Sequence, residues 1–421
     1  MPKVINQEEF LGLFRPGMKV FIQGCTSEPP TLLEALVGAP QCSRDVEYLG
    51  VPLPGYNRFD LAALHPEARM TTFFMTPELR RSPARNRIRF IPLNYSGIYR
   101  YLRDMPDLDL MLVQAAPGDR DGQCSYGLTS EHAPGALQSA HKVVVEMNAA
   151  VPYTHCVPAL PLERIDYILE SDRSPPQFPS PQLEDKAEAV GRHAATIIGD
   201  GDCLQIGIGR LQSAAMKAVR DYRDLGFHSG LISDETLDLV ESGALTGARK
   251  SRDNGIIVAG AVFGSRRLHE FATDPSVRLH GVGYTHEVPI IASIANFVSI
   301  NACMQVDLFG QVVADRINGR QISAPGGYGD FQRGARLSEG GRSIVLMIST
   351  SADGTISNVV PGFPAGSVLT GVRADTDYIV TEHGVADLRH KDIDQKAAAI
   401  IAVAAPAFRE ELERNWRDAP H

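Results

Sequence analysis

Cysteine is sparse in this chain and follows no binding pattern. Six cysteines are spread over 421 residues, with no C-x-x-C pair and no pair of histidines at zinc-like spacing. These absences argue against a disulfide framework and against a structural metal site. We therefore predict reduced, mostly buried thiols and no metal.

Long apolar segments are also missing. No stretch reaches about 18 uninterrupted apolar residues, the length that a membrane-spanning helix needs. Residues 1–6 show no apolar core of a secretion signal. We expect a cytoplasmic location and no membrane partner.

Basic charge is in short supply as well. The chain carries 41 Lys and Arg against 50 Asp and Glu, a formal net charge of −9. A nucleic-acid-binding protein usually presents a basic face, so we expect no nucleic-acid partner. A small anionic ligand held in a local basic pocket is compatible with this charge.

The length of the chain and one proline-rich stretch predict two α/β domains. Its 421 residues exceed one ordinary hydrophobic core. The stretch 171–182 holds four prolines and three serines without periodicity, which is typical of an exposed connection. We place the boundary there, with an N-terminal domain at 1–175 and a C-terminal domain at 183–421.

Short runs rich in valine, isoleucine and leucine alternate with helical patterns. The runs at 19–23, 110–113 and 142–146 are typical of buried parallel strands, and 31–36 has helical spacing. Together they predict βα units on largely parallel sheets.

Two glycine patterns could contact a ligand. Gly207 and Gly209 stand between an apolar strand and the helix predicted at 211–219, but Gln212 replaces the third glycine of a dinucleotide-binding motif. We favour a tight strand-to-helix turn there over a dehydrogenase. The second pattern, at 321–334, reads QISAPGGYGDFQRG and could aim backbone amides at developing negative charge, or be an ordinary surface turn.

Several motifs in order carry a family resemblance. They read INACMQVDLFGQV at 300–312, GGYGDF at 326–331 and VTEHGVADLR at 380–389. This order resembles the C-terminal domain of the acetyl-CoA hydrolase/transferase family, among the class I coenzyme A-transferases similar to 4-hydroxybutyrate CoA-transferase. QGCT at 23–26 and VEMN at 145–148 resemble its N-terminal half, so the resemblance covers nearly the whole chain.

The resemblance implies two similar α/β domains and an enzyme that moves coenzyme A between short-chain carboxylic acids. It implies acyl-CoA and carboxylate substrates, no permanently bound cofactor, and a homodimer or homotetramer. Alternatives are an acyl-CoA hydrolase and a non-catalytic acyl-CoA-binding or regulatory protein. By resemblance, the oxyanion-stabilising amides belong to Thr26, Gly326 and Gly327. The residues that the resemblance assigns to coenzyme A are Gly329, Asp330, Phe331, Glu382 and Gly384.

One position departs from the family. The family's nucleophile is a glutamate that follows a serine or threonine in a segment resembling HSELISDG, and the matching segment here, 226–235, reads GFHSGLISDE. Gly230 stands at the nucleophile's position. A carboxylate suits ping-pong acyl transfer because it is a leaving group as well as a nucleophile.

Three explanations for this glycine compete. First, another carboxylate could replace the glutamate, and Glu28 is the leading candidate. Its structural alternative is an acidic residue at the N-terminus of the helix predicted at 31–36. Glu235 is the second candidate, and it also fits the start of a helix. The acceptor acid or a water could attack directly, with His228 as base, although a histidine here is also compatible with packing. Finally, the chain could bind acyl-CoA without catalysis.

Overall fold

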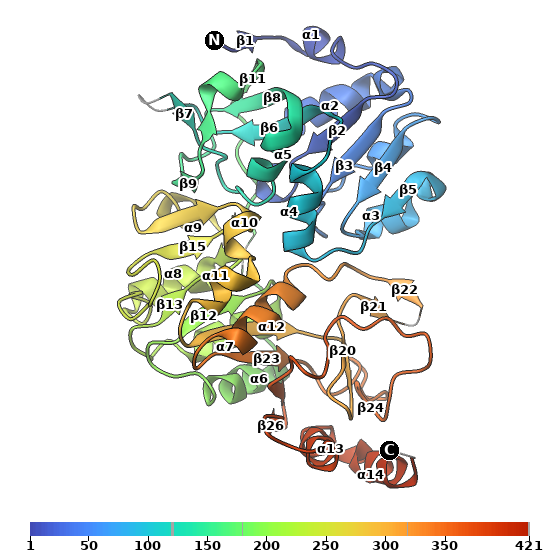
Figure 1. The fold of residues 1–421 in the computed structure, drawn as a ribbon, viewed down its shortest axis with the longest axis vertical. Coiled ribbons are helices and arrows are strands. Elements are labelled where there is room, and N and C mark those ends of the chain that lie inside the picture. Colours follow the sequence, from blue (N-terminus) through green and yellow to red (C-terminus); the bar gives the residue numbers. More distant parts are fainter. Residues whose placement is uncertain (119–121, 179, 318, 420–421) are drawn as a thin grey trace. The chain divides into compact units, whose positions relative to one another are not determined.

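The computed structural model describes residues 1–118, 122–178, 180–317 and 319–419. The chain divides into two compact units. Unit 1 comprises residues 1–178, 258–285 and 322–326, and unit 2 comprises residues 179–257, 286–321 and 327–421. Both units mix helices and strands (Figure 1). The boundary predicted at 171–182 remains a prediction.

Unit 1 is built on an eight-stranded sheet in the order β1-β11-β8-β6-β2-β3-β4-β5, and every neighbouring pair is parallel. Its strands are β1 (Lys3–Val4), β2 (Lys19–Ile22), β3 (Glu47–Gly50), β4 (Arg69–Thr72), β5 (Ile88–Phe90), β6 (Leu108–Ala115), β8 (Ala140–Asn148) and β11 (Tyr167–Ser171). The runs predicted at 19–23, 110–113 and 142–146 are thus confirmed as β2, β6 and β8.

The helices of unit 1 are α1 (Gln7–Leu11), α2 (Pro30–Gly38), α3 (Pro77–Arg81), α4 (Tyr95–Arg103), α5 (Ala133–Ser139), α9 (Arg266–Phe271) and α10 (Val282–Thr285). The helix predicted at 31–36 is confirmed as α2. Short strands complete the unit: β7 (Gln123–Cys124), β9 (Cys156–Val157), β10 (Leu160–Pro161), β16 (Ala261–Phe263) and β17 (Val277–His280). Strand β15 (Ile257–Ala259) lies where the two units join along the chain.

Unit 2 has a six-stranded sheet in the order β13-β12-β18-β23-β25-β26, parallel except for the last pair. Its strands are β13 (Gly226–Phe227), β12 (Cys203–Ile206), β18 (Phe297–Ala302), β23 (Arg342–Leu346), β25 (Tyr378–Thr381) and β26 (Gly384–Asp387). The smaller strands are β14 (Leu231–Ser233), β19 (Gln305–Asp307), β20 (Val312–Val313), β21 (Arg316–Ile317), β22 (Arg320–Gln321) and β24 (Val359–Val360).

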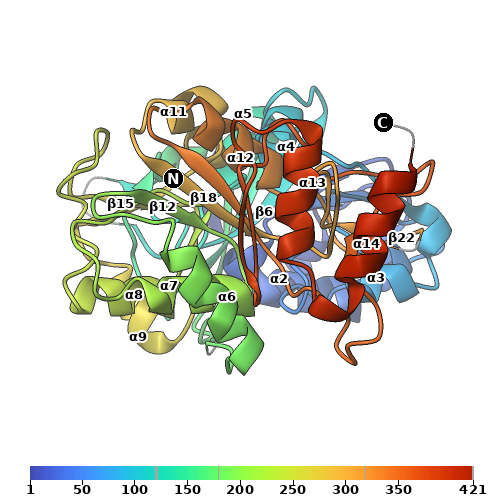
Figure 2. The same ribbon diagram turned by 90° about the horizontal axis from the view of Figure 1, so that it is seen from below.

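Helices cover both faces of this second sheet. Figure 2 shows α6 and α7 along one face of β12 and β18, and α11 and α12 along the other. The helices of unit 2 are α6 (Asp185–Ala195), α7 (Arg210–Ala218), α8 (Asp234–Glu241), α11 (Val288–Ala292), α12 (Tyr328–Leu337), α13 (Ile393–Ala402) and α14 (Pro406–Asp418). The predicted turn is also confirmed, because β12 ends at Ile206 and Gly209 is the N-cap of α7, with φ +141°.

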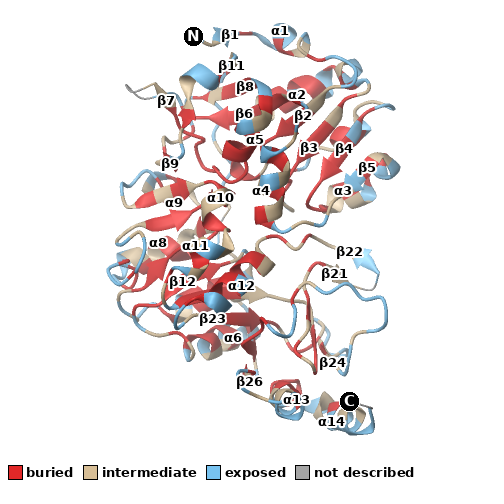
Figure 3. Ribbon diagram, in the orientation of Figure 1, coloured by how far each residue is buried: buried red, intermediate tan, exposed pale blue. Residues whose placement is uncertain are grey.

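The interior strands of both sheets, such as β2, β6, β12 and β23, are buried along most of their length, as Figure 3 shows by colour. The core of unit 1 joins residues of the sheet and of α2, among them Val20, Leu32, Tyr48, Leu110 and Val144. This burial explains why these strands read as continuous apolar runs. The predicted α/β class with largely parallel sheets is confirmed.

Four of the six cysteines are buried, as predicted: Cys25, Cys124, Cys156 and Cys203. Among the described residues, none of the helices combines the length and apolar character that crossing a membrane requires.

Candidate active site

The predicted oxyanion loop of unit 1 directly follows β2 and is firmly held. Residues Cys25–Ser27 form a 3₁₀ turn, and Cys25 adopts a left-handed φ of +57°. The Asn57 side chain holds this residue with two hydrogen bonds. Its Oδ1 accepts a hydrogen bond from the Cys25 amide at 2.9 Å, and its Nδ2 donates one to the Cys25 carbonyl at 3.1 Å. A strained backbone held from both sides is a feature of functional loops.

Thr26, the predicted oxyanion residue of this loop, is buried and hydrogen bonded through its side chain. Its hydroxyl lies 2.6 Å from the Thr129 hydroxyl and donates to the Leu128 carbonyl at 3.2 Å. The side chain therefore fixes the backbone of the loop. An oxyanion role for the Thr26 amide remains a prediction.

A thiol and a carboxyl group meet beside this loop. The Cys25 Sγ donates to Glu131 Oε2 at 3.1 Å, and both residues are buried. Burial raises the pKa of Glu131 to about 7, while the hydrogen bond from Cys25 lowers it. Burial, followed by the nearby Glu131 charge, raises the pKa of the Cys25 thiol. The Cys25 thiol therefore keeps its proton at neutral pH.

Glu131 was missed by the sequence analysis. It sits between Ser130 and His132 in a segment without strand or helix periodicity, and its φ is +27°. A left-handed backbone at a non-glycine residue is uncommon and needs surrounding structure to hold it. The one available signal was a lone acid in a run of small polar residues.

Glu28 does not cap α2, which changes the balance between its two interpretations. The first amides of α2 are taken by Glu146, whose carboxylate accepts Thr31 N at 2.8 Å and Leu32 N at 3.2 Å. Burial raises the pKa of Glu28 to about 8, while a hydrogen bond with Asn57 lowers it. A perturbed carboxyl group without a capping role favours a functional role.

In unit 2, Gly230 lies against the ring of His286. A Cβ atom built on Gly230 would lie 3.0 Å from Cε1 and 3.1 Å from Nε2 of that ring. His286 is 2% exposed and packs on Phe331, with ring centroids 4.4 Å apart. The space beside Gly230 is therefore filled by an imidazole that the sequence analysis did not identify.

Gly326 and Gly327, the two glycines predicted to donate oxyanion amides, differ in their backbone environment. Gly326 has φ +59°, which favours glycine, and its carbonyl accepts the Tyr95 amide at 3.0 Å in unit 1. Gly327 is the N-cap of α12 in unit 2. A Cβ built there would lie 2.7 Å from His286 Nε2, so only glycine fits beside this ring.

The residues predicted to contact coenzyme A form two groups within unit 2. Gly329, Asp330 and Phe331 lie in the first turns of α12, where Asp330 and Phe331 are buried. Glu382 lies between β25 and β26 and accepts Ser349 N and Oγ, each at 2.9 Å. Gly384 opens β26 with φ +140°. Their contact with the coenzyme remains a prediction.

The other two candidates near Gly230 are buried. His228 is 0% exposed and lies edge-on to Phe297, with ring centroids 6.1 Å apart. Glu235 is 3% exposed, and its Oε1 has no hydrogen-bond partner among the described residues. The capping box that starts α8 is made by Ser233 and Thr236, so Glu235 is not the capping side chain.

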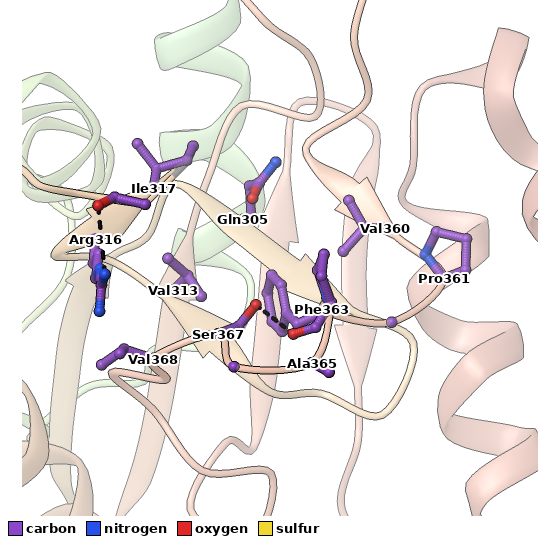
Figure 4. A pocket seen from close by; sticks show the side chains of 14 residues that line it. Gln305, Val313, Arg316, Ile317, Val360, Pro361, Phe363, Ala365, Ser367 and Val368 are labelled. Atoms are coloured by element: carbon purple, nitrogen blue, oxygen red, sulfur yellow. Dashed lines mark hydrogen bonds between the residues drawn. The ribbon is translucent and has the colours of Figure 1, made fainter.

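Unit 2 also contains a hollow beside the small sheet of β19, β20 and β24 (Figure 4). Its volume is about 590 Å³, a size suited to a small molecule or part of a larger one. Apolar side chains such as Val313 and Phe363 dominate the lining, and Arg316 adds a cation. Neither Gly230 nor His286 is among the lining residues.

Two units with parallel sheets and this order of motifs define an α/β protein of coenzyme A-transferase type. Residues 1–178 match the acetyl-CoA hydrolase/transferase N-terminal domain, and residues 264–416 match the acetyl-CoA hydrolase/transferase C-terminal domain. The chain belongs to the acetyl-CoA hydrolase/transferase family. This confirms the resemblance inferred from the motifs.

Two relatives and one solved structure cover most of the chain. The 4-hydroxybutyrate coenzyme A transferase of Clostridium kluyveri is 31% identical over 99% of this chain and 97% of its own. The succinyl-CoA:cyclohexane-1-carboxylate CoA transferase of Geobacter metallireducens is 34% identical over 84% and 81%. RipA from Yersinia pestis superposes with a TM-score of 0.90 at 29% identity, covering 99% of this chain and 97% of that one.

Proposed function

We propose that this chain is an enzyme that transfers coenzyme A from an acyl-CoA to a short-chain carboxylic acid. The observation that carries the proposal is the similarity to the Clostridium kluyveri transferase, which extends over 99% of this chain rather than over one domain. Fold alone would not justify this step, because one fold hosts many activities. The substrates are acyl-CoA and a carboxylate, with no permanently bound cofactor.

The loop after β2 supplies the catalytic groups of unit 1 in this proposal. The Thr26 amide is an oxyanion donor in this proposal, and the amides of Gly326 and Gly327 are further candidate donors, because developing negative charge needs fixed donors. Glu28 supplies a catalytic carboxyl group. With a pKa of about 8 it carries its proton at neutral pH, and a protonated carboxyl is a poor nucleophile. We therefore assign Glu28 to proton transfer.

We also propose roles for the other site residues predicted from the sequence. His228 is the base for direct attack by the acceptor acid or by water, which dispenses with a protein nucleophile at Gly230. Gly329, Asp330, Phe331, Glu382 and Gly384 shape the coenzyme side of the site. We also propose a cytoplasmic homodimer or homotetramer with no nucleic-acid or membrane partner, and a domain division at 171–182.

One assay separates this function from its alternatives. The full chain is incubated with acetyl-CoA or butyryl-CoA and a panel of short carboxylates, and the coenzyme A esters and free coenzyme A are quantified. New esters support transfer. Free coenzyme A alone indicates hydrolysis, and tight acyl-CoA binding without turnover indicates a binding protein. Either of the last two outcomes contradicts the proposal.

A further inference from the structure

Asn57 lies in the loop that follows β3 and contacts the loop that follows β2. These two strands are parallel neighbours in the sheet of unit 1, so their carboxyl ends lie at the same edge. The loops touch there, because a Cβ atom on Gly24 would collide with the Val51 carbonyl oxygen. Ligands of parallel α/β sheets bind outside the carboxyl ends of the strands. Asn57 therefore stands at the edge of the sheet where an active site is expected.

The Asn57 side chain uses its full hydrogen-bonding capacity. Its Oδ1 accepts two backbone amides, Cys25 N at 2.9 Å and Leu53 N at 2.7 Å. Its Nδ2 donates to the Cys25 carbonyl at 3.1 Å, and a further hydrogen bond joins Asn57 to the Glu28 carboxyl group. A side-chain amide has two acceptor sites and two donor protons, so these interactions occupy all four. The residue is 4% exposed, so water cannot readily replace a lost partner.

The segment 126–131 holds the same turn from another side and through different groups. Cys25 Sγ donates to Glu131 Oε2 at 3.1 Å, and Ser27 Oγ donates to the Tyr126 carbonyl at 2.8 Å. These bonds fix side chains of the turn, whereas Asn57 fixes its backbone. Among the described residues, Asn57 is the one whose side chain bonds both to this turn and to the Glu28 carboxyl group.

We propose that Asn57 is a positioning residue of this active site, whose side-chain amide fixes the Cys25–Ser27 turn and the Glu28 carboxyl group relative to each other. The inference rests on the proposed function, in which the turn supplies an oxyanion donor and Glu28 transfers a proton. The left-handed φ of +57° at Cys25 persists only where its surroundings hold it. Acyl transfer needs donor and proton-transferring group in one geometry, and Asn57 couples the two.

The hydrogen bond with Asn57 also affects the charge of Glu28. Burial raises the pKa of Glu28 to about 8, and the bond with Asn57 lowers it, because an amide donor favours the carboxylate. The other titratable groups around the turn are Cys25, Glu131 and Tyr95, each with a pKa raised first of all by burial. Removing the amide donor should therefore raise the pKa of Glu28 further, an effect that a purely structural residue would not have.

The first test follows the ionisation of Glu28 in the full-length protein without turnover. Asn57→Asp keeps an acceptor for the Cys25 and Leu53 amides, which favour its ionised form, but replaces the donor with a like charge. In protein carrying glutamate ¹³C-labelled at the carboxyl carbon, the Glu28 signal is identified by its loss in Glu28→Gln. It should titrate near pH 8 in the wild type and roughly one unit or more higher in Asn57→Asp. Equal titration in the two proteins would overturn the proposal.

The second test measures kcat and KM for coenzyme A transfer. Asn57→Ala should lower kcat roughly a hundredfold, the cost of misplaced catalytic groups, with a smaller change in KM. In a Glu28→Gln background the same substitution should cost less, because one of the groups that Asn57 positions no longer transfers a proton. Equal losses in the two backgrounds would show that Asn57 acts on the fold and not through Glu28.

Ser43→Ala is the matched control for lost stability. Ser43 is also buried in unit 1, and its hydroxyl lies 2.7 Å from the Tyr48 hydroxyl, near the start of β3 rather than beyond its end. This variant should lower the free energy of unfolding and leave kcat and the titration of Glu28 unchanged. If kcat falls in Ser43→Ala in proportion to the lost stability, instability explains both variants and the positioning role is refuted.

These measurements separate the inference from the proposed function. New coenzyme A esters from the wild type, together with an unchanged titration of Glu28 in Asn57→Asp, contradict the positioning role and leave transfer standing. The absence of new esters with every acyl-CoA in the panel contradicts the proposed function. The titration of Glu28 then decides the inference about Asn57 by itself, since it needs no turnover.

Discussion

The Glu146 carboxylate on β8 accepts the backbone amide of Thr31 at 2.8 Å and its hydroxyl at 2.7 Å, across 115 positions of the chain. Leu32 N donates to the same group at 3.2 Å. Glu146 is 0% exposed, so a single buried carboxylate satisfies the first donors of α2. It also joins the helix that follows the Cys25–Ser27 turn to β8 of the sheet in unit 1.

Glu146→Ala should therefore destabilise the chain strongly. The substitution leaves three donors of Thr31 and Leu32 without their acceptor, and losing hydrogen bonds to a buried charge costs about 3 kcal/mol or more. Glu146→Gln keeps one acceptor oxygen and should cost about 1–2 kcal/mol. Urea unfolding monitored by circular dichroism measures both changes.

Glu34→Gln serves as the matched control for this prediction. Glu34 lies on the exposed face of α2 and pairs with Arg173 at 2.7 Å. Exposed ion pairs contribute about 0–1 kcal/mol to stability, so this substitution should change the free energy of unfolding very little. Equal losses in the Glu34 and Glu146 variants would show that the buried carboxylate has no special part in holding α2.

The buried carboxyl of Glu131 predicts a stability that falls as pH rises. Its folded pKa of about 7 lies above the ordinary value of 4.5, so between these pH values the unfolded chain has released the proton and the folded chain has not. Stability should drop by up to about 3 kcal/mol across this window, at about 1.4 kcal/mol per pH unit.

Denaturation at several pH values checks this expectation. Glu131→Gln should make the slope between pH 4.5 and 7 smaller but not zero, because Glu28 also has a raised pKa. Glu163→Gln, at an exposed position of the same unit, should leave the slope as it is. A steeper slope in Glu131→Gln would contradict the assigned protonation state.

The sequence predicted the interior strands well because burial on both faces leaves a strong pattern. The runs at 19–23 and 142–146 match β2 and β8 to within a few residues. Short strands such as β13 and β20 have two residues each and were not predicted. Their existence depends on partners that are distant in sequence, which periodicity does not encode.

The candidate site was only partly predictable for the same reason. Gly230 stood out because its neighbours match a family motif, and Glu28 because it lies in a proline-stiffened loop. His286 is 56 positions from Gly230, and no spacing rule connects them; only packing does. The sequence also did not predict that the acceptor for the first amides of α2 comes from another strand, as the hydrogen bonds of Glu146 show.

Glu28 predicts a pH dependence of the rate. If its carboxyl group transfers a proton in turnover, the rate should change as pH passes about 8, where the group ionises. Glu28→Gln should remove this step from the profile of kcat against pH, whereas Glu28→Asp should shift it. Unchanged profiles in both variants would exclude a catalytic carboxyl at this position, and Glu34→Gln again provides a surface control.

The contact between Gly230 and His286 predicts a strong coupling between two substitutions. Gly230→Ala introduces a Cβ that would lie 3.0 Å from the ring, and such overpacking costs about 1–3 kcal/mol. In a His286→Ala background the methyl group has room, so the cost of Gly230→Ala should vanish or change sign. Unfolding of the four proteins in this cycle gives an expected coupling energy of about 1–3 kcal/mol. Gly38→Ala, where a Cβ would meet nothing within 4 Å, should show no coupling with His286→Ala. Additive effects at Gly230 and His286 would mean that the ring does not occupy the space beside residue 230.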